Sequence, residues 1–154
     1  MRRIKQQISE SECVALLKSE KRGVLAVLGD EGYPYTVPLD YFYDEDNGKI
    51  YFHGAKEGHK VDAISKCDKV SFCVLGKDIF KEDDWAPFVT SVIVFGRIKA
   101  VSSREEALEK VRKIGLKYYP NPEDVENVLE RTKDRVLCLE LSIEHMTGKR
   151  VHEK

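Results

Sequence analysis

The stretch YFHGAKEGHK, residues 51–60, gathers the side chains of this chain best suited to chemistry: two glycines, two histidines and two lysines. Glycine lets backbone N–H groups approach a phosphate closely. A helix that begins near Gly58 would add free N–H groups and the positive end of its dipole. Lys60 would supply a point charge, and His53 or His59 could donate hydrogen bonds. Two interpretations stay open: a cradle for a terminal phosphate, or a plain strand-to-helix turn.

Other kinds of chemistry have little support in the sequence. His53 and His59 stand six residues apart without a third ligand at a familiar spacing, so no metal site is expected. The chain contains no G-x-S-x-G motif and no serine or cysteine in a recognisable nucleophile context. The dinucleotide fingerprint G-x-G-x-x-G is also absent. A hydrolytic triad and a resident dinucleotide are therefore not expected.

The segment from Tyr33 to Tyr43 predicts an unusual strand. Its odd positions carry aromatic and aliphatic side chains, which alternation places on one face. Pro34 and Pro38 remove two backbone donors that point to the same lateral side. Part of this edge is therefore expected to be unpaired with other strands. The plain interpretation is an edge strand protected from aggregation, and the functional one is that the open edge and the aromatic face receive a flat ligand.

Composition is that of an ordinary soluble globular chain. The 154 residues suit one domain, with 42% hydrophobic and 34% charged residues and a net charge of −1. No basic excess for nucleic acid and no apolar run of membrane-spanning length is present, so neither partner is expected. None of the four cysteines forms C-x-x-C, which favours reduced, buried thiols in a cytoplasmic protein, with a structural disulfide as the minority interpretation.

The helices and strands that must position these residues are predicted from hydrophobic periodicity and from the glycine, proline and capping residues between segments. Helices are expected over 8–21, 58–66, a segment opened by a Ser102–Glu105 capping box, and 121–133. Three strands are expected within 22–54, separated by turns at 30–32 and 46–48. Further strands are expected over 69–76, over 88–102 with a bend at Gly96, and over 135–148.

About six strands with helices set beside them predict an α+β, mainly β domain. Direct hairpins join the early strands, so the sheet is expected to be antiparallel. Closure into a barrel would remove the exposed edges. An open sheet covered by helices on one face is the competing architecture.

Four segments resemble the FMN-binding split-barrel superfamily, the pyridoxamine 5′-phosphate oxidase-like proteins, and within it the 5-nitroimidazole-resistance branch. They are RGVLAVLGDEGYPYTVPLDYFYD, GKIYFHGAKEGHKVDAI, SVIVFGRIKAV and IEHMTGK. The resemblance implies a six-stranded antiparallel Greek-key split barrel with flanking helices, one domain over residues 1–154. It also implies a homodimer that holds FMN in a groove between its subunits.

The resemblance also assigns roles to residues of this chain. The isoalloxazine ring would lie against one strand segment, consisting of Val37, Pro38, Leu39, Asp40 and Tyr41. The ribityl-phosphate would run along His53, Gly54 and Ala55. Lys60 would bind the phosphate, with Gly58 permitting its approach. Ser91 and Val92 would complete the pocket wall, and Lys149 could approach the cofactor from the partner subunit.

The implied function is that of an FMN-dependent oxidoreductase reducing a small flat acceptor such as a nitroaromatic. The flavin would carry the electrons, and His53 would be the candidate proton donor. Two alternatives stay open: a non-catalytic flavin-binding protein, and a barrel of this kind that holds haem or a deazaflavin. Pyridoxamine 5′-phosphate oxidation is less expected, because the only tryptophan is Trp85 and the C-terminus lacks the basic, tryptophan-containing segment of those oxidases.

Overall fold

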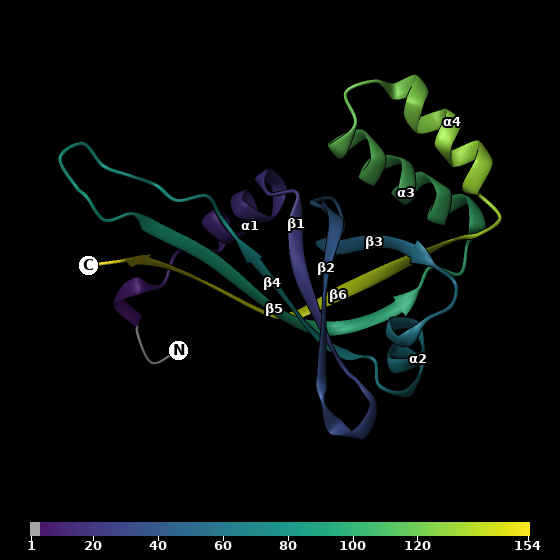
Figure 1. Ribbon diagram of the computed structural model, residues 1–154, viewed down its shortest axis with the longest axis horizontal. Helices are drawn as coiled ribbons and strands as arrows, with labels where there is room; N and C mark the ends of the chain where they lie inside the picture. Colours follow the sequence, from purple (N-terminus) through teal and green to yellow (C-terminus); the bar gives the residue numbers. More distant parts are fainter. Residues whose placement is uncertain (1–3) are drawn as a thin grey trace.

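A computed structural model describes residues 4–154, in which six strands form a closed barrel with helices at its sides (Figure 1). The strands are β1 (Arg22–Leu28), β2 (Pro34–Asp44), β3 (Lys49–Ala55), β4 (Lys69–Leu75), β5 (Phe88–Ala100) and β6 (Val136–His152). The helices are α1 (Glu10–Ser19), α2 (His59–Lys66), α3 (Arg104–Tyr118) and α4 (Pro122–Thr132), with short 3₁₀ turns η1 (Ile4–Gln6) and η2 (Asp30–Gly32).

The strands follow the order β1-β2-β3-β6-β5-β4 around the barrel, and every neighbouring pair is antiparallel. Hairpins place β1 beside β2 and β2 beside β3, whereas the pairs β3–β6 and β1–β4 join strands that are not consecutive in the chain, as in a Greek key. The predicted six-stranded antiparallel Greek-key barrel is confirmed. The competing open sheet is wrong, because pairing between β1 and β4 closes the ring.

The barrel is split between β2 and β3. These strands pair only where Tyr41–Asp44 faces Lys49–Phe52. Beyond that point residues 34–40 pair with β1 alone, and residues 53–55 pair with β6 alone. The unpaired edge predicted from the two prolines is therefore confirmed.

The barrel interior is filled by one side of each strand. Tyr41, Phe52 and Phe72 meet edge to face there, with ring centroids 5.0 Å apart in each pair. Val37 and Leu39 pack against the same core. The idea that the aromatic face of β2 receives a flat ligand is thus wrong for Tyr41, whose side chain is 0% exposed inside the barrel.

A second core lies outside the barrel, where α3 and α4 form an antiparallel hairpin beside β3 (Figure 1). Its buried members are Tyr51, Val111, Ile114, Val125, Leu129 and Cys138. A buried ion pair joins this hairpin to the barrel, since Lys110 Nζ lies 2.7 Å from Asp44 Oδ2. The α3–α4 hairpin is therefore fixed to the barrel by both apolar contact and charge.

Several local predictions are confirmed. Ser9 and Glu12 form the capping box of α1, and Asn121 caps α4 ahead of Pro122. The long β5 shifts its register against β6 between Phe95 and Gly96. In the described part of the chain, no helix is both long and apolar enough to cross a bilayer.

Three local predictions need correction. The cap of α3 is Ser103, which accepts a hydrogen bond from the Glu106 N–H, so the predicted Ser102–Glu105 box was one residue early. β6 continues to His152, because β5 is long enough to pair with it throughout. The four cysteines are free, as expected, but Cys73 is exposed on the outer face of β4.

Candidate functional site

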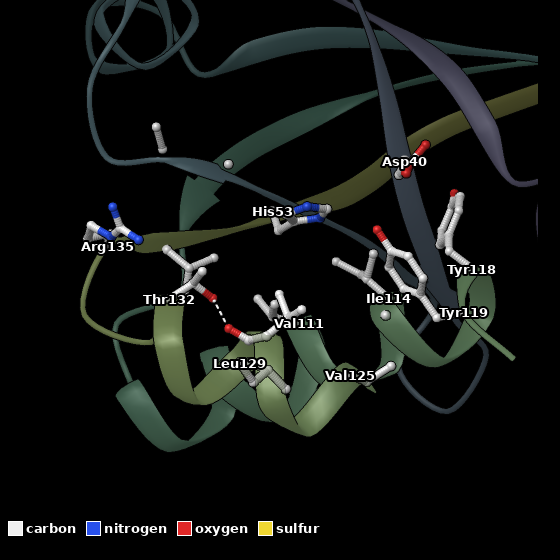
Figure 2. Close-up of a pocket in the computed structure, with 15 residues that line it drawn as sticks. Asp40, His53, Val111, Ile114, Tyr118, Tyr119, Val125, Leu129, Thr132 and Arg135 are labelled. Carbon is white, nitrogen blue, oxygen red and sulfur yellow. Dashed lines mark hydrogen bonds between the residues drawn. The ribbon is translucent and has the colours of Figure 1, made fainter. Parts of the chain in front are cut away.

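A pocket of about 540 Å³ lies between the barrel and the α3–α4 hairpin (Figure 2). Its strand wall consists of Asp40 of β2 and His53, Gly54 and Ala55 of β3. Its helical wall consists of Val111, Ile114, Gly115, Tyr118, Tyr119, Val125, Val128, Leu129, Thr132, Arg135 and Val136. The pocket thus has one mixed polar wall and one largely apolar wall.

His53 points into this pocket because strand alternation sends it to the face opposite Phe52, which fills the barrel core. The residue is exposed to solvent, while neighbouring protein atoms partly desolvate its ring. Burial lowers the pKa of His53 below its ordinary value; the Asp40 carboxylate opposes the shift and Lys60 reinforces it. The imidazole is therefore mainly neutral at pH 7, with one ring nitrogen able to donate and the other to accept.

Lys60 is held over the backbone of Gly54. A Cβ added at Gly54 would lie 3.0 Å from Lys60 Nζ, so a larger residue would press on the ammonium. The lysine is half-buried, and burial lowers its pKa. Within residues 4–154 no carboxylate forms an ion pair with Lys60. A desolvated cation without a counter-ion is suited to binding an anion.

Gly58 completes this cradle at the start of α2. Its φ of 124° and ψ of 166° belong to a region that essentially only glycine adopts. Its carbonyl oxygen accepts from the Val61 and Asp62 N–H groups, whereas within residues 4–154 no side chain accepts from the His59 and Lys60 N–H groups. His59 faces elsewhere: its ring packs edge-on against Tyr35, and Nδ1 lies 3.5 Å from Asp30.

The predicted β2 segment divides by strand alternation. Asp40 reaches the pocket and accepts a hydrogen bond of 2.9 Å from Arg22 Nε. Pro38 is exposed on the same face as Asp40. Val37 and Leu39 turn toward the barrel core but stay partly exposed, and their backbone lies on the open edge. Tyr41 is fully buried and lies where β2 pairs with β3.

Ser91 and Val92 do not join the pocket within one chain. They lie on β5, opposite Leu75 and Val74 of β4. Val92 is buried in the barrel core, whereas Ser91 faces outward. The single chain therefore brings together the predicted residues of β2, β3 and α2 but not those of β5.

The helical wall was missed in the sequence. Only the amphipathic pattern of the two helices marked it, and that pattern is equally typical of helices that cover a core.

The end of α3 is anchored by Lys117, which donates a 2.5 Å hydrogen bond to the Glu20 carbonyl and lies over the Tyr41 ring. Burial lowers the pKa of Lys117 to about 8. Next to it, the Tyr118 hydroxyl accepts a 3.0 Å hydrogen bond from the Tyr41 N–H.

Residues 9–150 match the protein family described as pyridoxamine 5′-phosphate oxidase. No curated protein matches the chain significantly. The family match covers nearly the whole length of the barrel and its helices.

Solved structures share the fold at low sequence identity. A candidate 5-nitroimidazole antibiotic resistance protein from Bacteroides thetaiotaomicron is 18% identical, with a TM-score of 0.77 over 95% of this chain and 87% of that chain. A FAD-binding protein from Mesorhizobium loti is 23% identical, with a TM-score of 0.66 over 95% and 97%. The flavocytochrome Anf3 from Azotobacter vinelandii is 19% identical, with a TM-score of 0.76 over 97% and 71%.

Proposed function

The chain belongs to the pyridoxamine 5′-phosphate oxidase family, and we propose that residues 1–154 form one FMN-binding domain of an oxidoreductase. The observation that carries this proposal is Lys60, a half-buried cation without a carboxylate partner in the described chain, held over Gly54 beside the open edge of β2. A flat ligand with a terminal phosphate matches both features. The flavin-binding neighbours from Mesorhizobium loti and Azotobacter vinelandii support the choice of a flavin.

The residues fit such a ligand from one end to the other. The phosphate would lie against Lys60 and the first N–H groups of α2. Gly54 keeps the approach free of a side chain. The ring would lie along the unpaired edge of residues 37–40, where backbone N–H and C=O groups could bond its polar rim. Haem, the alternative ligand, also carries carboxylates that a lysine could bind, so the absorbance spectrum of the bound cofactor decides between the two.

Bound FMN supplies electron transfer to a small flat acceptor, for which a nitroaromatic is the proposed class. The chain itself would provide binding, orientation and a proton route. His53 is both open to solvent and directed into the pocket, so its imidazole can pass a proton between water and an acceptor. The apolar helical wall would hold the acceptor's body and limit access of water.

A homodimer is the proposed assembly, because the outer face of β1, β4 and β5 exposes an apolar strip. Its members are Val24, Leu28, Leu75, Ile93 and Phe95. Val24, Cys73 and Ile93 are paired in register across three strands, which makes the strip continuous. Ser91 faces the same side, where it could meet the partner's cofactor. Light scattering is expected to give the mass of two chains, and a monomer with bound FMN would contradict this assembly.

The function is tested by the absorbance spectrum and mass of what co-purifies. We expect a yellow protein that releases FMN on denaturation, is bleached by NAD(P)H and recovers its colour with a nitro compound. A colourless protein that does not take up added FMN would refute the flavin. If the colour is bleached but does not recover when a nitro compound is added, the protein binds a flavin but does not reduce nitro compounds.

A further inference from the structure

Arg135 occupies one end of the pocket, next to Thr132, while His53 lies above its middle and Asp40 lies toward the other end (Figure 2). The arginine is exposed and begins the approach to β6. In residues 4–154 no carboxylate pairs with its guanidinium, even though five acidic residues lie within ten positions of it. Its charge is therefore available to a ligand.

The nearby carboxylates are engaged by other cations. Asp134 pairs with Arg104 at 2.5 Å, and Glu126 pairs with Arg112 at 2.5 Å. Glu130 pairs with Lys133. At the far end of the pocket, Asp40 is bonded to Arg22. Arg135 therefore lines the pocket as a cation that has no acidic partner within residues 4–154.

Arg135 and Lys60 serve different sides of β3. The missing Cβ of Gly54 points to the same side as Phe52, and that is where Lys60 Nζ lies. His53 points to the opposite side, into the pocket that Arg135 lines. One phosphate bound by Lys60 therefore leaves a second anion position at Arg135.

The wall next to Arg135 is suited to an apolar body. Val125 and Leu129 form its floor, and Val128 presents a side chain that is 53% exposed. An exposed valine beside a concave surface gains free energy when an apolar ligand covers it. The pocket therefore combines an apolar surface with one available positive charge.

We propose that this pocket binds an acceptor composed of a flat apolar body and a carboxylate, and that Arg135 binds the carboxylate. The inference rests on the proposed function for the acceptor's role in electron transfer. The binding site itself is formed by residues of this chain alone, so it can be tested in protein with and without flavin.

The test is calorimetric titration with 4-nitrobenzoate and with its methyl ester, without reductant, on FMN-loaded and flavin-free protein. We expect the acid to bind more tightly than the ester. Arg135→Gln removes a charge-assisted hydrogen bond that solvent partly screens, so it is expected to weaken binding of the acid about tenfold. Its affinity for the ester is expected to be unchanged. Val128→Ser is expected to weaken both ligands equally, about threefold, because it removes apolar surface.

Arg131→Gln is the matched control, because Arg131 is exposed on α4 but does not line the pocket. It is expected to bind both ligands like the unaltered protein. Equal affinity for acid and ester, or equal effects of the two arginine substitutions, would overturn the proposal. A loss of FMN affinity relative to riboflavin in Arg135→Gln would also overturn it, by assigning the arginine to the cofactor's phosphate. The flavin content of each preparation is measured independently by its absorbance. A protein without flavin that still binds the acid through Arg135 would contradict the proposed function but not this inference.

Discussion

The two walls of the pocket are built in different ways. The strand wall comes mainly from one short stretch, His53–Ala55, with Asp40 of β2 beside it, and its position is fixed by the β3–β6 ladder and by the split from β2. The helical wall is assembled from residues of α3, α4 and the start of β6, which lie 50 or more positions later in the chain. The first wall depends on backbone pairing and the second on side-chain packing.

This difference separates cofactor binding from acceptor binding in the proposed function. A backbone-paired wall offers constant geometry, which suits a phosphate and a ring held by N–H and C=O groups. A packed helical hairpin offers a surface that substitutions can reshape without unpairing a strand. The hairpin nevertheless needs fixed attachment, and the buried pair between Lys110 and Asp44 provides a polar part of it.

The largest expected effect is therefore on the attachment of the helical wall. Lys110→Ala leaves Asp44, 3% exposed, as an unpaired buried charge. Breaking such a pair costs about 3–5 kcal/mol of unfolding free energy. Urea unfolding at pH 7 measures the loss. Lys113→Ala is the matched control, since Lys113 is partly exposed and its ion pair with Glu109 should contribute under about 1 kcal/mol.

The same variant has a defined pH dependence. Burial would raise the pKa of Asp44, but the hydrogen bond and charge of Lys110 hold it below its ordinary value. In the unaltered protein this stabilisation is present above about pH 4, the unfolded pKa, and is lost as pH falls through the lower folded pKa. Without Lys110 the buried carboxyl favours its protonated form. The cost of Lys110→Ala should therefore shrink between pH 7 and pH 4, and a constant cost would contradict a charged Asp44.

The next effect concerns the strand wall and its cradle. Lys60→Ala leaves the N–H groups of α2 but removes a charge-assisted bond worth about 1.5–3 kcal/mol. FMN affinity should fall about ten- to hundredfold, with riboflavin affinity nearly unchanged because riboflavin lacks the phosphate. Fluorescence titration with both flavins measures this.

Lys66→Ala is the matched control, because it removes a lysine from the other end of α2, where Lys66 pairs with Asp30. Its FMN affinity should equal that of the unaltered protein. If Lys60→Ala lowers the affinity for both flavins equally, or for neither, the cradle interpretation of residues 51–60 is wrong.

The two walls also differ in how much of each could be predicted from the sequence. The strands, their antiparallel hairpins and the open edge of β2 followed from alternation, turn residues and two prolines, all of which act over a few positions. The proximity of Gly54, Gly58 and Lys60 followed for the same reason. Local signals sufficed because the wall itself is local. Closure into a barrel depends on the distant pairing of β1 with β4, and it was expected from the family resemblance and from the removal of exposed edges.

The helical wall required information that local patterns do not carry. Burial of Lys110 depends on Asp44, 66 positions earlier, and no helical periodicity marks a lysine as buried. Arg135 became a candidate only once the neighbouring carboxylates were seen to pair elsewhere. Alternation correctly placed Tyr41 with Leu39 but could not tell whether that face met a ligand or the barrel core.

The smallest expected effect links the two sides of β3 through His53. Lys60 helps to lower the pKa of His53, so Lys60→Ala should raise that pKa in flavin-free protein. A bound phosphate should act in the same direction, because an anion near the imidazole favours its charged form. The change in the pKa is expected to be under about one unit, since the two groups lie on opposite sides of β3.

NMR titration of the imidazole resonances measures this shift, with His53→Gln to assign the signal. Riboflavin is the control ligand, because it covers the same wall without adding a phosphate. FMN should raise the pKa of His53 more than riboflavin does, and FMN binding should then take up protons near that pKa. Equal shifts with both flavins would mean that the phosphate does not influence His53. In that case the imidazole would respond to the flavin ring and the helical wall alone.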